Sequence, residues 1–93
     1  MAFLRVLIDD KSYKDHLIPA GRTSIGRRSD NDIVINNVGV SNNHARLNFE
    51  KNYYLTDLRS SNGTYLNGDK ILHAKLSDGD EINFSGVQAI FYI

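Results

Sequence analysis

The sequence has no cysteine and no excess of charge of either sign. Without cysteine there can be no disulfide, no thiolate nucleophile and no cysteine-ligated metal centre, and a cytoplasmic location fits best. Eleven lysine and arginine residues balance eleven aspartate and glutamate residues, so no overall field draws the chain to nucleic acid or to an anionic membrane. Any site for an anion must therefore be local.

Long apolar runs are also missing. The opening segment MAFLRVLIDD contains a short apolar run that Arg5 interrupts and Asp9 and Asp10 close. It is too short for a membrane span and lacks the layout of a signal peptide. No linker, repeat or low-complexity tract divides the chain. We therefore expect residues 1–93 to form a single domain and a monomer, long enough to bury roughly 60 to 65 per cent of the surface that the unfolded chain exposes.

Apolar residues alternate with polar ones along most of the chain, and no window of a dozen residues carries a helical stripe. In ARLNFE at 45–50, every second residue is apolar, the pattern of a half-buried strand. The same alternation occurs at Leu4, Val6 and Ile8, at Ile33 and Ile35, at Ile82 and Phe84, and at Val87, Ala89, Phe91 and Ile93. Turn signals separate these runs at Asn36-Asn37, Asn62-Gly63, Asn67-Gly68 and Asp78-Gly79-Asp80. Many short strands with polar turns predict an all-β fold, an antiparallel β-sandwich of about eleven strands.

Residues that could carry catalysis or bind a metal or cofactor do not form a convincing pattern. Ser41 and His44 are three residues apart, but there is no G-x-S-x-G elbow and no third member of a triad. The three histidines, at positions 16, 44 and 73, lack a paired metal-ligand spacing. Asp30-Asn31-Asp32 resembles a fragment of a calcium loop, but the glycine and distal glutamate are not at the required offsets. We expect no enzyme, no metal and no cofactor.

Three polar loops remain: GRRSDNDI at 26–33, VSNNHA at 40–45 and SSNGTYLNG at 60–68. In a sandwich the loops gather at two ends, so loops that follow strands of the same direction can meet on one rim. Such a meeting would place the Arg27 guanidinium beside the hydroxyls of Ser41 and Ser61 and the amides of Asn42 and Asn62. One charged fork among neutral donors suits a phosphate group, because hydrogen bonds to an ionised oxygen are short and strong.

Three motifs in this order resemble the forkhead-associated (FHA) domain, a family that reads phosphothreonine in partner proteins. They are Gly26-Arg27, then Ser41-Asn42-Asn43-His44, then Ser61-Asn62-Gly63-Thr64 followed by Asn67-Gly68. The Asp57-Leu58 lead-in and the segment LSDGD at 76–80 agree with the family pattern. The resemblance runs from about Arg22 to Ile93. It implies a sandwich of the FHA and SMAD-like type with its binding loops at one rim.

The resemblance also implies roles for single residues. It assigns Arg27, Ser41, Asn42 and Ser61 to the phosphate and Asn62 to the peptide backbone beside the phosphothreonine. It gives Gly26, His44, Gly63 and Asn67 structural roles around the binding loops and turns. The partner would be a protein or peptide that a Ser/Thr kinase has phosphorylated, and the function would be non-catalytic signalling.

Two positions depart from the family pattern. The residue after the motif serine is often basic but is the neutral Asn42 here, and the residue before Asn62 is usually threonine but is Ser61. Arg28 and Arg59 flank the predicted site and are candidates for restoring positive charge. A competing hypothesis is a phosphate-independent scaffold of the same fold that binds its partner through a sheet face, and a third is a weak phosphatase that uses Ser41 and His44.

Overall fold

The computed structural model describes residues 1–93 as eleven β-strands without a helix, which confirms the predicted fold class. The strands are β1 Phe3–Leu7, β2 Tyr13–Leu17, β3 Gly21–Gly26, β4 Ile33–Val34, β5 Ala45–Phe49, β6 Tyr53–Asp57, β7 Thr64–Leu66, β8 Asp69–Ile71, β9 His73–Lys75, β10 Glu81–Phe84 and β11 Val87–Tyr92. With no helix in the fold, no element has the length and apolarity that a helical bilayer crossing needs.

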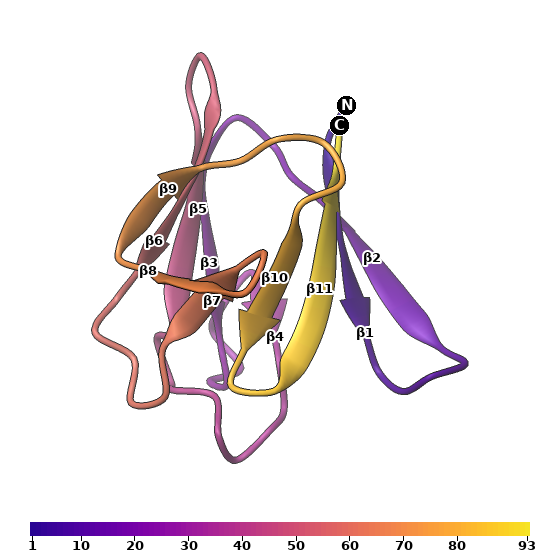
Figure 1. The fold of residues 1–93 in the computed structure, drawn as a ribbon, viewed down its shortest axis with the longest axis vertical. Helices are drawn as coiled ribbons and strands as arrows, with labels where there is room; N and C mark the ends of the chain where they lie inside the picture. The colour runs from indigo at the N-terminus through magenta and orange to yellow at the C-terminus, as the bar shows by residue number, and fades with distance from the viewer.

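The strands form two sheets that pack face to face (Figure 1). The six-stranded sheet has the order β2-β1-β11-β10-β7-β8, and the five-stranded sheet has the order β4-β3-β5-β6-β9. Every neighbouring pair is antiparallel except β3 and β4, which run parallel. Because β1 and β11 are neighbours and Phe3 lies opposite Tyr92, the two ends of the chain lie side by side.

The core consists of sixteen buried apolar residues from both sheets. In β5, Ala45 and Leu47 are fully buried whereas Arg46 and Asn48 are partly exposed, as the alternation predicts. Three isoleucines assigned to strands from the same pattern are not in them, and of these Ile35, which follows the end of β4, is still buried. Ile8 is 68% exposed because β1 ends at Leu7 and the chain turns, and Ile93 is 60% exposed because it follows the end of β11. Alternation alone does not show where a strand ends.

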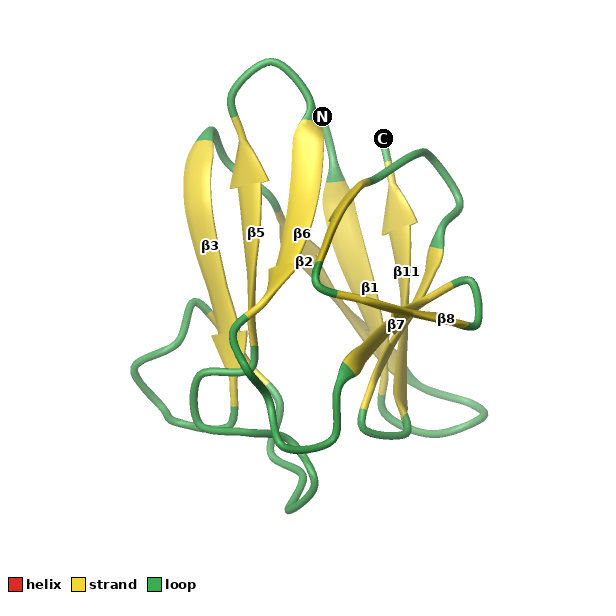
Figure 2. Cartoon of the chain, turned by 60° about the vertical axis from the view of Figure 1, so that its left-hand side comes forward, coloured by secondary structure: helices red, strands yellow, loops and turns green.

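Two of the predicted turn signals act in different ways. Asn67 and Gly68 both have positive φ, 49° and 91°, and form the two-residue connection between β7 and β8. This is the backbone that a tight hairpin requires. Gly63 has φ of 87° but lies in a longer loop between β6 and β7. That loop and the connections after β3 and β4 gather at the end of the sandwich opposite the chain termini (Figure 2).

Candidate functional site

The first part of the candidate site is the end of β3, where two loops press against Gly26. A Cβ atom at this residue would lie 2.1 Å from the carbonyl oxygen of Asn42 and 2.8 Å from Nδ2 of Asn31. Gly26 has no positive φ, so glycine is required here for close approach rather than for backbone freedom. The backbone amide of Arg27 then donates to the carbonyl of Ser41 at 3.0 Å. Gly26 therefore allows the loop that contains Arg27 and the loop that contains Ser41 to lie in contact.

The three arginines near this end differ in their surroundings. Arg27 is exposed, and no hydrogen bond or ion pair within the chain engages its guanidinium. Arg28 forms an exposed ion pair with Asp30, with 3.4 Å between Nη2 and Oδ2. Arg59 is also exposed and has the uncommon φ of 57° for a residue other than glycine. Arg27 is thus a charged group on this rim that has no anionic partner.

Ser41 joins two loops through its side chain. Its Oγ accepts a hydrogen bond from the backbone amide of Ser61 at 2.9 Å. A hydroxyl that accepts in this way still has its own proton to donate. Ser61 itself is exposed, and its side-chain hydroxyl has no partner in the chain. Two hydroxyls therefore lie on neighbouring loops, and both can donate to an anion.

His44 lies beneath these loops and is fully buried. Its Nδ1 accepts from the backbone amide of Ser41 at 3.1 Å, so the proton of the neutral ring must be on Nε2. Nε2 in turn donates to the carbonyl of Gly63 at 2.9 Å. The ring also packs edge-on against Phe84, with centroids 5.6 Å apart. One buried side chain thus connects the loop after β4 with the loop after β6 and with the core.

Asp57 organises the loop after β6, and the search for site residues in the sequence missed this role. Its carboxylate accepts from the Ser60 hydroxyl at 2.5 Å, from the Ser60 amide at 3.1 Å and from the Thr64 hydroxyl at 2.7 Å. Burial acts to raise the pKa of Asp57, but these hydrogen bonds outweigh it and hold the pKa below its ordinary value. Ser60 Oγ also accepts from the amide of Gly63 at 2.9 Å. The Asp57-Leu58 lead-in was the only signal in the sequence.

Three of the asparagines on this end differ in their contacts. Asn62 donates through Nδ2 to the carbonyl of Gly39 at 2.8 Å and to Ser85 Oγ at 3.1 Å, while its Oδ1 has no partner. Asn31 was not among the predicted residues, but it is 9% exposed and donates to the carbonyls of Arg28 and Asn42 at 2.9 and 2.7 Å. Asn42 has an exposed side chain. Asn31 therefore braces the loops, while Asn42 and Oδ1 of Asn62 are available to a ligand.

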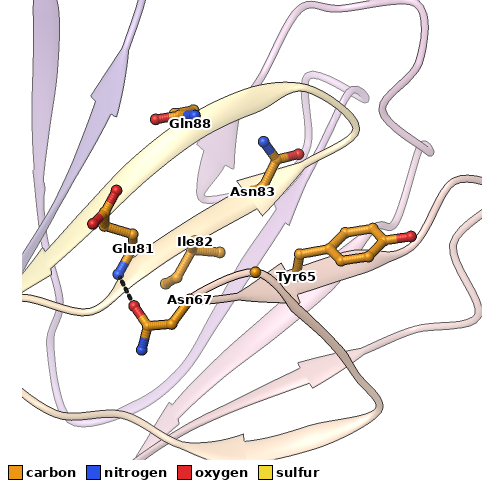
Figure 3. Close-up of a pocket in the computed structure, with 7 residues that line it drawn as sticks. Tyr65, Asn67, Glu81, Ile82, Asn83 and Gln88 are labelled. Atoms are coloured by element: carbon orange, nitrogen blue, oxygen red, sulfur yellow. Dashed lines mark hydrogen bonds between the residues drawn. The ribbon is translucent and has the colours of Figure 1, made fainter.

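Asn67 lies elsewhere. Its Oδ1 accepts from the amide of Glu81 at 2.9 Å and its Nδ2 donates to Asp80 at 3.0 Å, so it links the β7–β8 turn to the start of β10. It also lines a cavity of about 490 Å³ over β7, β10 and β11 (Figure 3). Glu81 is the only charged residue in that lining. A cavity with one carboxylate and no cation is unsuited to an anion, so the open rim around Arg27 is the better candidate.

The loops predicted to meet do meet, through backbone and side-chain hydrogen bonds from Arg27 to Ser41, from Ser61 to Ser41 and from Asn62 to Gly39. Arg27, Ser41, Asn42, Ser61 and Asn62 come from these loops. Their free donors are the unpaired guanidinium of Arg27, the hydroxyls of Ser41 and Ser61 and the side-chain amide of Asn42, while Asn62 leaves its Oδ1 as an acceptor. This is a set of donors with one positive charge, which matches the chemistry of a phosphate group.

Comparisons with known proteins agree with this geometry. The family profile described as FHA domain matches residues 23–85. The transcriptional regulatory protein EmbR of Mycobacterium tuberculosis is 39% identical over 89 residues, which cover 94% of this chain and 23% of EmbR. The glycogen accumulation regulator GarA of the same organism is 37% identical over 76 residues, which cover 81% of this chain and 47% of GarA. The chain therefore spans less than half the length of either relative.

Solved structures of other proteins share the whole fold. M. tuberculosis EmbR in complex with a low-affinity phosphopeptide aligns with a TM-score of 0.90 and 36% identity, covering 99% of this chain and 24% of that one. The FhaA FHA domain, complexed with the intracellular domain of Rv3910, aligns with a TM-score of 0.91 and 29% identity, covering 98% of this chain and 99% of that one. Together with the family profile, these matches establish that the chain belongs to the FHA domain family.

Proposed function

We propose that the chain binds a phosphothreonine-containing segment of a partner protein and catalyses no reaction. The observation that carries the proposal is the unpaired guanidinium of Arg27, which lies on the same rim as the hydroxyls of Ser41 and Ser61. One relative of the same fold has been solved with a phosphopeptide, and another belongs to a study of phosphothreonine-dependent FHA domain interactions. In this role Arg27, Ser41, Asn42 and Ser61 bind the phosphate.

The remaining residues take supporting roles in the proposal. Asn62 holds the peptide backbone through Oδ1, which no group of the chain engages. Gly26, His44 and Gly63 fix the loops, and Asp57 is added to this group on the strength of its hydrogen bonds. Arg28 and Arg59 remain candidates for flanking contacts. The kinase that phosphorylates the partner belongs to the Ser/Thr class, since the product is phosphothreonine.

The geometry around His44 argues against the phosphatase hypothesis. A general base must lie within hydrogen-bond reach of the hydroxyl that it activates. Both ring nitrogens of His44 are engaged by backbone groups, Nδ1 by the Ser41 amide and Nε2 by the Gly63 carbonyl. The Ser41 hydroxyl instead meets the Ser61 amide. No side chain near Ser41 is therefore placed to remove its proton, and binding is the chemistry that this arrangement supports.

Matched phosphorylated and unphosphorylated peptides would test the proposal in titrations of the wild type, Arg27→Ala and Arg28→Ala. Arg27→Ala should lower affinity for the phosphorylated peptide by roughly ten- to a hundredfold, because a hydrogen bond to a charged group contributes about 1.5 to 3 kcal/mol. Arg28→Ala is the matched control, because its guanidinium is already paired with Asp30, and it should lose less. Equal binding of both peptides by the wild type would favour the phosphate-independent scaffold instead.

Two wider expectations stay predictions. The domain should act as a monomer, and it should act in the cytoplasm, where a kinase can phosphorylate its partner. Sedimentation of the purified chain, with and without phosphopeptide, would test the first. Fractionation of cells that produce the protein would test the second.

A further inference from the structure

The outer face of the five-stranded sheet is positively charged, although the net charge of the whole chain is zero. Side chains that point away from the core form two rows across β3, β5, β6 and β9, as the strand register shows. The row nearer the loops is Ser24, Arg46, Thr56 and His73, and the second row is Arg22, Asn48, Tyr54 and Lys75. We call these eight residues the cationic face. It contains three permanently positive side chains and no carboxylate.

None of the three cations is paired. The ion pairs in the chain are Arg5 with Asp15 and Arg28 with Asp30, and neither includes a residue of the cationic face. The carboxylate of Asp32 borders the face and lines a cavity together with Arg22, but it accepts hydrogen bonds from Ser24 and forms no ion pair with any of the three cations. The positive charge of this face is therefore available to an external anion.

The outer face of the six-stranded sheet is different. There Arg5 lies beside Asp15 and forms two hydrogen bonds with it, at 2.8 and 3.1 Å. Glu81 lies further along the same row, and Lys70 is opposite Tyr65. Two cations and two anions thus cancel on that face. The cationic face is a feature of one sheet only.

The cationic face is also firmly built. Thr56 Oγ1 and His73 Nδ1 are 2.7 Å apart, and the rings of Tyr54 and His73 stack with centroids 5.3 Å apart and an interplanar angle of 9°. The other five residues of the cationic face have polar side chains that can hydrogen-bond to carboxylates. A sheet face with fixed polar side chains can receive an extended segment without rearranging.

The face continues directly from the proposed phosphate site. The first row, at Ser24, Arg46 and Thr56, lies one residue from Ile25, Ala45 and Asp57, where the strands meet the binding loops. Figure 2 shows β3, β5 and β6 side by side above those loops. The second row is two residues further along each strand, about 7 Å away. A peptide bound at Arg27 can therefore reach both rows within a few residues.

We propose that the cationic face binds an acidic stretch in the same partner that carries the phosphothreonine. This inference rests on the proposed function and specifies the class of partner. Nucleic acid fits the face less well, because phosphate contacts dominate duplex binding and three cations can neutralise only about three phosphates. The ring of Tyr54 is already stacked on His73, so it offers no free platform for a base. An acidic peptide needs only a short row of cations and polar neighbours.

The test compares two peptides with the same phosphothreonine core. One carries about six glutamates beyond a spacer of about four residues, a reach of roughly 13 Å when extended, and the other carries glutamines in their place. Each is made with the tract on either side of the phosphothreonine. They are titrated against the wild type, the double variant Arg46→Gln/Lys75→Gln, and Lys11→Gln, a control in the exposed turn between β1 and β2.

The wild type and Lys11→Gln should bind the glutamate peptide roughly three- to tenfold more tightly than the glutamine peptide at low salt. The gain should appear with the tract on at least one side of the phosphothreonine. This gain should shrink as salt rises, since exposed charges are screened. The double variant should bind both peptides equally, with unchanged affinity for the glutamine peptide. No gain in the wild type, or a gain that the double variant keeps, would refute the acidic stretch.

Two further outcomes have their own meaning. If the phosphorylated glutamine peptide does not bind the wild type, the proposed function has failed and this inference fails with it. If that peptide binds, duplex DNA, anionic vesicles and free acidic peptide can each be used to displace the glutamate peptide. If DNA or vesicles displace it at a lower concentration of negative charge than free acidic peptide does, the face binds another class of ligand. Either result overturns the proposal. Binding of the phosphorylated glutamine peptide to the wild type shows which of the two has occurred.

Discussion

The interior of the sandwich and its loop-bearing end both contain buried side chains, but different forces hold them. Leu47 and Leu55 are fully buried among apolar side chains of the core. His44 is equally buried, but its ring nitrogens connect backbone groups of two loops. Apolar packing depends on volume and shape, whereas the loop end depends on specific donors and acceptors. Substitutions in the two regions should therefore separate stability from binding.

The largest effect on stability is expected in the core. Leu47→Ala should lower the free energy of unfolding by about 2 to 5 kcal/mol, because it removes buried methyl groups and leaves a cavity. Leu47 is apolar and fully buried, so it cannot contact the phosphopeptide. The protein that remains folded should therefore bind phosphopeptide with unchanged affinity. Urea unfolding and titration at a temperature where the variant is folded would measure both.

Leu72→Ala is the matched control, since Leu72 is 77% exposed and should lose little stability. A Leu47→Ala protein that is fully folded but binds several-fold more weakly would contradict the separation. It would mean that the core transmits its packing to the loops.

A smaller loss of stability, joined to a loss of affinity, is expected at the loop end. His44→Ala removes the acceptor for the Ser41 amide and the donor for the Gly63 carbonyl. Leaving buried polar groups without partners costs about 1 to 3 kcal/mol, and the two loops would no longer be held together. We expect a lower urea midpoint and weaker phosphopeptide binding by the folded protein.

Lys51→Ala is the control for this variant, because Lys51 is exposed in the turn between β5 and β6 and makes no side-chain hydrogen bond or ion pair. It should leave both the midpoint and the affinity for a short phosphopeptide nearly unchanged. A His44→Ala protein with the wild-type midpoint would show that the buried ring does not brace the loops.

The same contrast explains what the sequence could predict. Alternation identified the buried positions of β5, β10 and β11 because a strand has a period of two and one face must be apolar. It extended β1 and β11 to Ile8 and Ile93, because both are apolar and in phase although the strands have ended. Hydrophobicity thus reports which face is buried more reliably than where a strand ends.

The loop end was predicted only where a motif supplied the residues. The motifs named Arg27, Ser41 and Asn62, and the convergence of their loops followed from the sandwich. Asn31 and Asp57 were not identified as braces, because an asparagine or aspartate near a turn is common and its hydrogen bonds depend on how the loop folds. Asn31 reaches Asn42 across eleven residues, a contact that only the folded chain defines.

A substitution at Asp57 tests whether its charge helps to hold the loop end. Asp57→Asn keeps the shape but replaces hydrogen bonds to a charged acceptor with neutral ones, so stability at pH 7 should fall by about 1 kcal/mol. The folded pKa of Asp57 is lowered from the ordinary value of 3.8. The stabilisation is therefore fully present above that value and is lost as the pH falls through the lower folded pKa.

Urea midpoints of the wild type and Asp57→Asn between pH 7 and the acid limit of folding would measure this. The two midpoints should converge at acid pH. Asp69→Asn, an exposed carboxylate on β8 without a hydrogen-bond partner, is the control and should match the wild type throughout. A constant difference between wild type and Asp57→Asn at all pH values would mean that the NH2 group, which cannot accept a hydrogen bond, rather than the lost charge is responsible.

The smallest expected effect concerns the methyl group of phosphothreonine. The family resemblance implies a small cavity that accepts this methyl, and burying one methyl contributes about 0.8 kcal/mol, or roughly fourfold in affinity over phosphoserine. Ser61 stands where the family usually has threonine, so part of the cavity wall is missing. Because Ser61 is exposed and only its backbone amide is engaged, by Ser41 Oγ at 2.9 Å, Ser61→Thr can add the wall without breaking a side-chain contact.

One peptide made in phosphothreonine and phosphoserine forms would be titrated against the wild type, Ser61→Thr and Ser77→Thr, which lies in the connection between β9 and β10. The wild type should prefer phosphothreonine modestly, Ser61→Thr should prefer it more strongly, and Ser77→Thr should behave as the wild type. If the wild type binds both forms equally, the chain reads phosphate without reading threonine. If it prefers phosphothreonine but Ser61→Thr prefers it no more, residue 61 does not form the wall, and the discrimination must come from the rest of the rim, where Asn62 and Gly63 follow the family pattern.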